Sequence, residues 1–524
     1  MVIVSHSIST VTDSPLPHNR MPRYNGAVTR IPVTKEFMMR PTLKFLDEAL
    51  IERIISEALD LLATLGMEVQ NGNAAALLGD HGAGVDVAKG RVTLPESLVL
   101  DAVKSAPSGL ELFDVVGNRT HDLSGDNVHF TPGSSGIAVL DSETGKTRTP
   151  VTRDLVDFTK LTSRLPHIDA ASTAFVCSDV PEQVQDSYRL FICLMYCEKP
   201  VVTGAFTIES YRVMRDLQIA IRGSADALAA KPLTIFSCCP TAPLKWSDVT
   251  AQNLLDCAAD LVPIELISMP LTGFMGPVTI VGSLVQHTAE TLSGVVLSQL
   301  ANPGCPVLYG GSPAAFDMRY ETTPMGAIET QMIDCAYSEI GKHLGLPTQA
   351  YIGLSDSKAL DAQAGLETSM GATLAALAGI NSISGPGMLD FETTLSLEKL
   401  VVDHEICGLT KRMVEGVEPK DDFPARPHFE EMLEEGHLLI SNHTRKHLRS
   451  EHCFPGPVIE RANVSRWREE GSRTLDERAR AEVSRHLSEY EPPRIDEDVR
   501  RELVELMTTE AARYGMDTLP ERED

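Results

Sequence analysis

Short apolar runs alternate with longer amphipathic segments through the central part of the chain. Eight such runs occur, each followed by a loop rich in Gly, Ser, Pro or Cys: 128–131, 171–176, 201–203, 233–236, 264–269, 307–309, 349–352 and 381–384. They recur roughly every 30–40 residues, which is the length of a strand plus a helix. Eight strand–helix units predict an α/β fold, a closed (β/α)8 barrel of the TIM type. An open doubly wound sheet is the alternative, and it usually has fewer units.

The region before these units carries helical periodicity. Apolar residues follow the i, i+3, i+4 spacing of a helix over 47–65, and Gly66 is suited to end that helix. A second helix is predicted over 96–105. Residues 1–40 are rich in Ser, Pro, Thr and Arg without periodicity, so they predict a loose arm.

The region after the units is charged and again helical. Helices are predicted over 476–487 and 496–508, separated by the Pro-rich joint at 491–493. Its apolar content is modest, which favours an extension packed on the barrel over a free-standing domain. We therefore divide the chain into an N-terminal arm (1–40), an N-terminal helical extension (41–127), the barrel (128–422) and a C-terminal helical extension (423–524).

Composition indicates a globular protein with a strong negative charge. Of 524 residues, 43% are hydrophobic and 23% charged, and 73 acidic against 46 basic residues give a formal net charge of -27. This excess argues against nucleic acid or an anionic membrane as a partner. No apolar stretch approaches the about 18–20 residues of a membrane span, and the N-terminus lacks a secretory signal pattern.

The cysteines indicate a reducing compartment. The chain has ten, with no CxxC pair, which is typical of reduced thiols, so we predict a cytoplasmic protein. No metal site is predicted. Zinc held by Cys238, Cys239 and a distant histidine is the alternative.

The segment 353–367 concentrates polar side chains directly after the seventh predicted strand. It contains Asp356, Lys358, Asp361 and Glu367, and the following residues predict a helix over 368–380. Polar groups this dense beside a buried strand are costly unless they face a cleft or each other. The segment is therefore either one wall of a site or a capped strand-to-helix turn.

The carboxyl ends of barrel strands are where a TIM-type barrel places its site. In this chain those ends are mostly small or glycine-rich, with few titratable groups, and neither a hydrolase Ser-His-Asp order nor an HExxH motif occurs. Such a mouth suits a wide cavity. Aromatic residues make up only 5% of the chain, yet several lie beside predicted strand ends, where they could surround a quaternary ammonium by cation–π attraction.

Several stretches of the chain resemble the trimethylamine methyltransferase superfamily. The resemblance runs from about residue 40 to about residue 510 and rests on these stretches: Thr203-Gly204, Tyr309-Gly310-Gly311-Ser312-Pro313, 353–367 with its Ser-Asp-Ser-Lys and Asp-Ala-Gln-Ala-Gly cores, 384–390, and 443–449 followed by Phe454-Pro455. Members are barrels of methylamine metabolism that pass a methyl group from a methylated amine to the cobalt of a corrinoid protein. Pyrrolysine-containing members take trimethylamine, and members without it take quaternary amines such as glycine betaine.

The resemblance implies a corrinoid-dependent methyltransferase of the non-pyrrolysine branch, because this chain has only standard residues. The expected substrate is a betaine-type quaternary amine. A tertiary amine such as trimethylamine, another methylated cation, or a barrel that binds a quaternary amine without turnover are the alternatives. An unrelated barrel lyase would need a Schiff-base lysine on a strand, and Lys358 lies beyond its strand.

The resemblance also implies a partner and a set of site residues. No DxHxxG motif occurs, so the corrinoid is expected on a separate protein, with none bound covalently to this chain; a homo-oligomer stays open. We predict Asp356 and Lys358 as catalytic or loop-locking residues and Arg319 or His287 as ligands of a substrate carboxylate. The predicted ammonium cage is Phe206, Tyr309, Tyr351 and Phe391. The glycines predicted to let the corrinoid come close are Gly204, Gly310, Gly311, Gly385 and Gly387.

Overall fold

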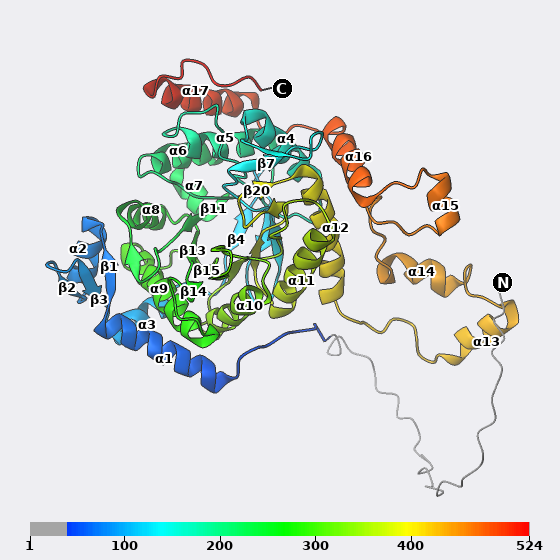
Figure 1. Cartoon of the computed structure of the whole chain (residues 1–524), viewed down its shortest axis with the longest axis horizontal. Helices are drawn as coiled ribbons and strands as arrows, with labels where there is room; N and C mark the ends of the chain where they lie inside the picture. The colour runs from blue at the N-terminus through cyan, green and yellow to red at the C-terminus, as the bar shows by residue number, and fades with distance from the viewer. Residues whose placement is uncertain (1–38, 523–524) are drawn as a thin grey trace, which may run out of the picture.

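Eight parallel strands form the centre of the molecule. The computed structural model describes residues 39–522 (Figure 1), so most of the predicted arm over 1–40 lies outside the described residues. The strands are β6 (His129–Thr131), β9 (Ala171–Ser172), β10 (Val201–Thr203), β11 (Thr234–Cys238), β13 (Ile264–Ser268), β15 (Val307–Gly311), β17 (Gln349–Tyr351) and β18 (Ser382–Ser384). All eight coincide with the predicted runs.

The strands pair in two arcs that meet on both sides. One arc has the order β15-β13-β11-β10-β9 and the other β17-β18-β6. A single parallel bridge between Tyr309 and Thr348 joins β15 to β17. On the other side, the amides of Asp169 and Ala170, just before β9, donate to the carbonyl of Phe130 in β6. The strands thus follow one another around the barrel in chain order, and the predicted TIM-type α/β fold is confirmed.

A helix follows each strand and covers the outside of the barrel (Figure 1). In order these helices are α4 (Thr152–Arg164), α5 (Gln185–Tyr196), α6 (Ser210–Arg222), α8 (Asp248–Ala259), α9 (Ile280–Ala301), α10 (Ile328–His343), α11 (Ala362–Ala378) and α12 (Leu397–Val414), with the short α7 (Ala225–Ala230) after α6. The helix predicted over 368–380 begins earlier, at Ala362, because the Asp361 side chain accepts hydrogen bonds from the amides of Gln363 and Ala364. None of these helices, nor any other within residues 39–522, is long and apolar enough to cross a membrane.

The segment before the barrel is a mixture of helices and strands. The predicted first helix is α1 (Glu48–Thr64), capped by Asp47, and the second is α3 (Glu96–Ser105). Between and beside them lie α2 (Gly72–Asp80), β1 (Met67–Val69), β2 (Gly84–Asp86) and β3 (Arg91–Thr93), and β1 pairs with β12 (Lys245–Trp246) of the barrel region. The N-terminal extension was predicted to be helical. It also contains a small sheet, which joins it to the barrel.

A hairpin closes the barrel at the amino ends of its strands. It consists of β4 (Glu111–Phe113) and β5 (Arg119–Asp122). Its apolar residues Leu110, Leu112 and Leu123 form one buried cluster with three strand residues, Val202, Ile235 and Leu308. Those three side chains therefore mark the inner face of the barrel wall, and the hairpin is its floor.

The C-terminal extension has two parts. The helices α16 (Leu475–Ser488) and α17 (Glu497–Arg513) correspond to the two predicted helices and pack on α12 and α4, and on α5 and α6, respectively. The helices α13 (Arg426–Glu435), α14 (Asn442–Glu451) and α15 (Val464–Glu469) project to one side of the barrel (Figure 1). Among the described residues, these three helices bury no side chain.

Short strands lie in the loops after the barrel strands and build up the mouth. They are β7 (Ala138–Leu140), β8 (Thr147–Arg148), β14 (Leu271–Thr272), β16 (Ala314–Ala315), β19 (Met388–Leu389) and β20 (Thr394–Leu395). They form two small sheets, β19-β20-β7-β8 and β14-β16. One sheet thereby joins the loops after the first and last barrel strands, and the other joins the loops after the fifth and sixth strands.

Candidate functional site

A buried glutamate stands on the inner wall of the barrel. Glu265 of β13 is the register partner of both Ser237 and Leu308, so it shares the inner face with Leu308 above the hairpin floor. Its Oε1 accepts a hydrogen bond of 2.6 Å from the Ser237 hydroxyl. Burial raises the pKa of Glu265 to about 7. A carboxyl held half-neutral in a closed interior is a common property of binding and catalytic sites.

Neighbouring strands add further polar groups to this interior. Gln349 and Tyr351 of β17 share one face, and Ser384 of β18 is the register partner of Tyr351. The Tyr351 hydroxyl lies 3.2 Å from the Ser134 hydroxyl. Gln349 accepts a hydrogen bond from the Gly311 amide at 3.1 Å. Polar side chains thus line the wall on β11, β13, β17 and β18.

A second glutamate reaches the same space from the loop between β19 and β20. Burial raises the pKa of Glu392 to about 8, opposed by a hydrogen bond from Ser312 and supported by the charge of Asp356. The pKa of Tyr351 is raised by burial first and then by both Glu265 and Glu392. The two carboxyls therefore lie close enough to act on one phenol.

Four buried polar atoms in this region have no hydrogen-bond partner anywhere in the described chain. They are Glu265 Oε2, Gln349 Nε2, Ser384 Oγ and Glu392 Oε1, hereafter the unsatisfied atoms. A buried polar atom without a partner is destabilising by about 1–3 kcal/mol, and such atoms are rare in folded proteins. Four of them around Tyr351 indicate a site built for a polar or charged ligand.

The loop that carries Glu392 has an unusual backbone. Asp390, Phe391 and Glu392 have φ angles of 49°, 55° and 65°, in the left-handed region that non-glycine residues rarely adopt. Three such residues in succession are strained, and strain of this kind is typical of functional loops whose side chains must point in one direction. Here the conformation directs Glu392 inward while Phe391 stays at the rim.

Two of the predicted residues meet at this rim. The Lys358 ammonium lies 3.8 Å from the centre of the Phe391 ring, and 3.4 Å from a carboxylate oxygen of Asp390. Lys358 Nζ also donates to the Asp356 carbonyl at 2.7 Å. Lys358 therefore ties the loop together, as one of the two predicted roles requires. Its carboxylate partner is Asp390, and it contacts Asp356 only through the backbone carbonyl. Because Lys358 already occupies one face of Phe391, that face is not free for a substrate cation.

Asp356 has a structural role in the described contacts. Its two carboxylate oxygens accept hydrogen bonds from the Met325 and Gly326 amides at 2.9 and 2.8 Å. Burial raises its pKa to about 6. Glu367 on α11 accepts from the Ser355 hydroxyl and the Asp356 amide at 2.5 and 2.9 Å. The polar segment is thus a capped strand-to-helix turn, which was one of the two readings of the sequence.

Tyr309 and His287 do not lie in the barrel interior. Tyr309 follows Leu308 on β15 and so faces outward, where its hydroxyl donates to Thr288 of α9 at 2.8 Å. The His287 ring stacks on Tyr337 of α10 at 4.1 Å, and its Nε2 lies 3.0 Å from the Gly310 carbonyl. Burial lowers the pKa of His287 to about 3, so it is neutral. Both predictions are corrected: these rings pack between the strands and the outer helices.

The predicted glycines mostly contact this chain itself. A Cβ atom at Gly310 would lie 2.5 Å from Gln349, one at Gly311 would lie 2.4 Å from His287, and one at Gly385 would lie 2.4 Å from the Ile352 carbonyl. Gly387 is buried, and its amide donates to Asp403 at 2.7 Å. Gly204 is half-buried at the end of β10. Close packing within the wall requires these glycines. The four buried ones, Gly310, Gly311, Gly385 and Gly387, give no support to the prediction that they face a corrinoid.

The two remaining predicted residues are exposed. The Phe206 side chain lies over the guanidinium of Arg189 at 5.0 Å, at the carboxyl end of β10, and is 59% exposed. Arg319, in the loop after β16, is bound by Asp317 at 2.6 Å. Of the predicted cage, Tyr351 therefore lines the interior, Phe206 and Phe391 lie at the rim, and Tyr309 lies outside.

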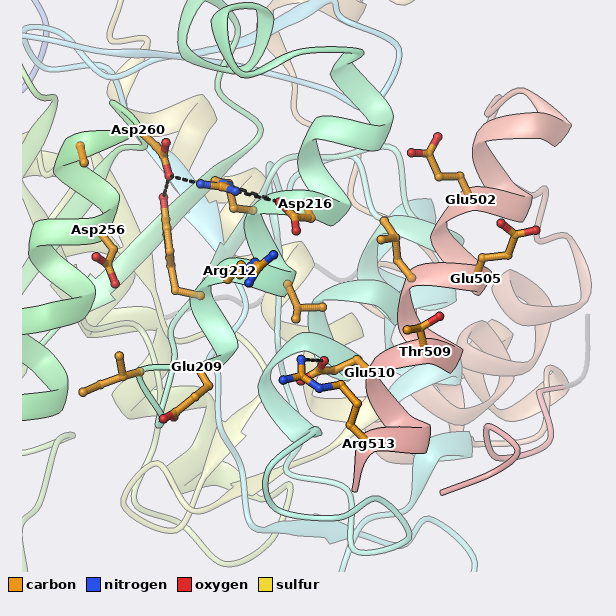
Figure 2. Close-up of a pocket in the computed structure, with 16 residues that line it drawn as sticks. Glu209, Arg212, Asp216, Asp256, Asp260, Glu502, Glu505, Thr509, Glu510 and Arg513 are labelled. Carbon is orange, nitrogen blue, oxygen red and sulfur yellow. Dashed lines mark hydrogen bonds and ion pairs between the residues drawn. The ribbon is translucent and has the colours of Figure 1, made fainter. Parts of the chain in front are cut away.

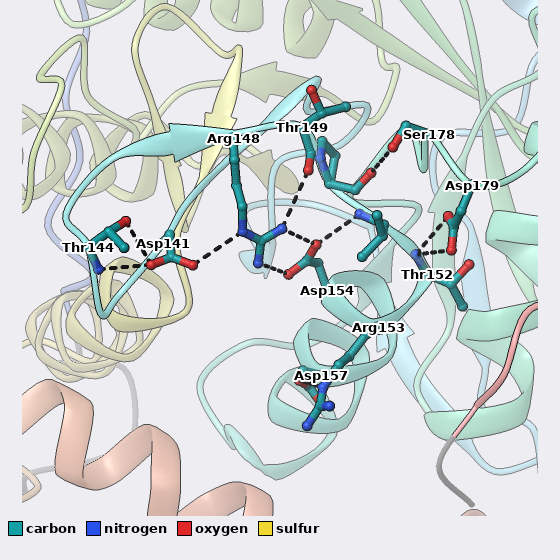
Figure 3. Close-up of polar contacts among 12 residues, drawn as sticks. Asp141, Thr144, Arg148, Thr149, Thr152, Arg153, Asp154, Asp157, Ser178 and Asp179 are labelled. Carbon is teal, nitrogen blue, oxygen red and sulfur yellow. Dashed lines mark hydrogen bonds and ion pairs between the residues drawn. The ribbon is translucent and has the colours of Figure 1, made fainter.

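A network of ion pairs and hydrogen bonds fixes the loops on one side of the mouth (Figure 3). Arg148 of β8 donates to both oxygens of Asp154 at 2.7 Å, and to Asp141 at 3.2 Å. Asp179, after β9, accepts from the Thr152 amide at 2.9 Å. Bidentate pairs of this kind hold a defined geometry. The loop after β6 is thereby fastened to the amino end of α4.

A large surface cavity lies elsewhere. A depression of about 1160 Å³ lies between α6, α8 and α17, outside the barrel, and Figure 2 shows the residues that line it. Its walls are acidic, but Arg215 is paired with Asp216 and Asp260, and Arg513 with Glu510. It is a solvated seam between the C-terminal helix and the barrel helices, and we assign no site to it.

The residues that the sequence analysis missed are Glu265, Glu392, Gln349 and Ser384. A signal was available for Glu265, since it is the single charged residue inside the mostly apolar run 264–269. Burying an unpaired charge in a strand is costly, so such a residue is a candidate for function. Glu392 carried no comparable signal, because its inward position depends on the backbone of the loop.

The chain matches a known protein family over most of its length. The profile of the family described as trimethylamine methyltransferase (MTTB) matches residues 19–515. Trimethylamine methyltransferase MttB of Desulfitobacterium hafniense (strain DSM 10664 / DCB-2) is 28% identical over 472 residues, 90% of this chain and 95% of that protein. MttB of Methanosarcina barkeri is 30% identical over 451 residues, 85% of this chain and 90% of that protein.

Two further proteins are similar. The glycine betaine methyltransferase of Desulfitobacterium hafniense (strain Y51) is 27% identical over 478 residues, 91% of this chain and 98% of that protein. The crystal structure of the Methanosarcina barkeri monomethylamine methyltransferase (MtmB) aligns with a TM-score of 0.49 at 11% identity, covering 86% of this chain and 88% of that chain. On the strength of the profile match over nearly its whole length, the chain belongs to the trimethylamine methyltransferase (MttB) family.

Proposed function

We propose that this protein transfers a methyl group from a quaternary amine of the betaine type to the cobalt(I) of a corrinoid carried by a separate protein. The observation that carries the proposal is the set of four unsatisfied atoms around Tyr351. They line a barrel interior that holds two carboxyls and a phenol, a setting suited to a small organic cation. The similarity to a glycine betaine methyltransferase supports this substrate class.

The reaction needs little chemical help from the protein. A quaternary nitrogen already carries the positive charge that makes it a leaving group. The carbon–nitrogen bond breaks with its electron pair going to nitrogen, which becomes a neutral tertiary amine. The new bond to the methyl carbon takes its electron pair from cobalt(I), so no proton is transferred. Positioning and exclusion of water are then the tasks of the barrel.

The raised pKa values of Glu265 and Glu392 suit this task. The substrate nitrogen loses its charge in the transition state, so two fully ionised carboxylates would stabilise the bound substrate more than the transition state. With pKa values of about 7 and about 8, the pair carries a partial charge near neutral pH. The site thus attracts the cation without holding it too strongly.

The surface around the mouth suits docking of a partner protein. Large apolar side chains on the loops that follow the strands are exposed: Ile137, Phe206, Phe274, Val278, Met318 and Tyr320. Phe274 and Phe316 stack at 4.9 Å and join the loops after β14 and β16. Exposed apolar groups gathered on one face commonly mark an interaction site. We place the corrinoid protein on this rim.

The substrate class is tested with a panel of methylated cations. Purified protein is mixed with glycine betaine, longer betaines, trimethylamine or a dimethylsulfonium compound, and with free cob(I)alamin, and the visible spectrum is followed. We expect methyl transfer from at least one betaine and none from trimethylamine. Transfer from trimethylamine alone would support the tertiary-amine alternative. Binding without transfer, even with the cognate corrinoid protein, would support a binding barrel.

Substrate binding is expected to depend on pH. Glu265 and Glu392 are protonated at about pH 6 and ionised at about pH 9, since their pKa values lie between. A cation binds the ionised form more tightly, so the dissociation constant for the quaternary amine should fall at least roughly tenfold over this range. Isothermal titration calorimetry without corrinoid measures it, and the Glu392→Gln variant should lose the part of the change near pH 8. A dissociation constant that is flat with pH would contradict the placement of both carboxyls at the site.

A charge on the rim is expected to impair reaction with the partner. Val278 is 70% exposed in the loop before α9, so Val278→Glu should fold normally. We expect the KM for the cognate corrinoid protein to rise roughly tenfold, because an apolar contact becomes a buried charge. The rate with free cob(I)alamin serves as the comparison and should change far less. Val87→Glu, on the exposed turn between β2 and β3, is the matched control; equal loss in both variants would argue against the rim.

A further inference from the structure

Two histidines and a carboxylate converge in the C-terminal extension, outside the barrel. His443 and His447 lie one turn apart on α14, so both face the loop that carries Asp421. Asp421 Oδ1 lies 2.9 Å from His443 Nδ1 and 2.7 Å from His447 Nε2. The three potential ligand atoms all lie within 4.8 Å of one another. Within residues 39–522, this is the group of metal-ligating side chains that converges, and it does not include Cys238 or Cys239.

The contacts of His447 are not those of a satisfied ion pair. Its Nε2 is buried and, among the described residues, makes no hydrogen bond of acceptable geometry, although it lies 2.7 Å from the Asp421 oxygen. The buried Nε2 atom of His447 is therefore available to bind a cation that Asp421 Oδ1 also contacts, once the two atoms move apart. The other nitrogen-bearing ring, His443, approaches the same oxygen.

The surroundings of the cluster hold its ligands in place. His428 of α13 lies with its ring 4.4 Å from that of His443, and its Nε2 contacts the Asp421 carbonyl at 2.9 Å. Lys446 donates to Asp421 Oδ2 at 3.1 Å, which keeps Oδ1 directed toward the histidines. Outer partners that orient a ligand, as these do for Asp421 and His443, are typical of metal sites.

A bound metal would stabilise the position of α13 and α14. The helices α13 and α14, both within the described chain, bury no side chain, so hydrophobic packing contributes little to their position. Small segments that lack a core are often held by a metal or a disulfide instead. Asp421 and the histidines connect the loop after α12 to α14 across the intervening helix.

We propose that Asp421, His443 and His447 bind a Zn²⁺ ion that holds the loop around residue 421 against α14. Two imidazoles and one carboxylate are a common zinc ligand set, and bonds of about 2.0–2.2 Å place tetrahedral ligand atoms about 3.3 Å apart. The contacts of Asp421 Oδ1 must therefore open by about half an ångström, which side-chain rotation supplies. Water fills the fourth position. The site is independent of the methyl-transfer proposal.

Zinc binding is tested on the full chain. Protein stripped with a chelator is titrated with Zn²⁺ against a chromophoric competitor, and metal content is measured by mass spectrometry. We expect about one zinc per chain bound at micromolar or lower free zinc, and a higher Tm with zinc than with chelator. His447→Ala should weaken binding roughly 100-fold. His452→Ala, which removes an exposed histidine just beyond α14, is the matched control and should bind normally.

Two outcomes would overturn the proposal: no zinc bound by the unaltered protein at about 10 µM free zinc, or equal binding by His447→Ala. Either result would show that Asp421, His443 and His447 form only ion pairs and hydrogen bonds with one another. If His447→Ala does not fold, cobalt(II) bound to the unaltered protein gives the answer. Intense visible absorption of four- or five-coordinate cobalt supports the site, and the weak spectrum of the hexaaqua ion contradicts it.

Discussion

Glu265→Gln is expected to raise the KM for the quaternary amine roughly 100-fold at pH 8 while kcat stays the same or rises. At that pH the Glu265 carboxyl is mostly ionised, because its pKa is about 7. Loss of a desolvated charge opposite a bound cation costs about 2–3 kcal/mol. The interaction is strongest with the charged ground state, so the loss falls on binding rather than on the chemical step. Steady-state kinetics with a saturating corrinoid acceptor measure both constants.

The fold of this variant is checked separately. Burial disfavours the ionised carboxyl of Glu265, so the native protein loses stability as the pH rises from the ordinary glutamate pKa to about 7, and most of that loss is present at pH 8. Replacing it with neutral glutamine should therefore leave the Tm at pH 8 unchanged or higher. Glu398→Gln is the matched control and should leave the KM for the quaternary amine unchanged. Glu398 on α12 is also buried with a raised pKa, but it lies outside the barrel interior. A collapse of kcat with an unchanged KM would assign Glu265 to the chemistry instead.

Lys399→Met is expected to destabilise the protein by about 3–5 kcal/mol, because it leaves a buried charge without its partner. Lys399 and Asp403 form an ion pair on α12 in which both side chains are fully buried. Asp403 also accepts the Gly387 amide at 2.7 Å, and thereby holds the segment leading to the strained loop of Glu392. The loss should appear as a lower Tm and a lower urea midpoint.

The pH dependence of this variant gives a second test. Burial already raises the pKa of Asp403, so without Lys399 the carboxyl is neutral over a wider range. The destabilisation should therefore be smaller at about pH 5 than at about pH 8. The double variant Lys399→Met/Asp403→Leu should recover much of the loss, since no buried charge remains. Arg466→Met, which breaks an exposed pair with Glu470, should leave the Tm unchanged. A single variant as stable as the double one would contradict the role of the pair.

The architecture of the barrel could be predicted from the sequence for a physical reason. Parallel strands are buried on both faces, so each one is a continuous apolar run that needs no tertiary information to recognise. The helix α1 was equally accessible, because a capping aspartate and a regular apolar face mark it locally. The floor hairpin was not, since β4 and β5 are short and their burial depends on Val202, Ile235 and Leu308, which are distant in sequence.

The site was less accessible to prediction because the face of each side chain depends on register. A shift of one residue turns a strand side chain from the interior to the outside. Tyr309 and Gly310 are neighbours at a strand end, yet the Tyr309 ring packs on α9 while Gly310 makes room for Gln349 inside. The dense polar segment after β17 drew attention through its composition, but Asp356 and Glu367 use that polarity to bind backbone amides. Glu265 was signalled only by its position inside an apolar run.

The pairing of β6 with β18 has a consequence for synthesis of the chain. His129, Phe130 and Thr131 take Ser382, Ile383 and Ser384 as their register partners, so the first strand of the barrel pairs with the last. At ribosomal rates of about 5–20 residues per second, roughly 10 to 50 s separate their emergence. During that time β6 has an unpaired edge, which is the kind of surface that promotes misassembly. The nascent protein is therefore most exposed to aggregation before its final helices are made, and molecular chaperones acting on the ribosome-bound chain should improve its yield.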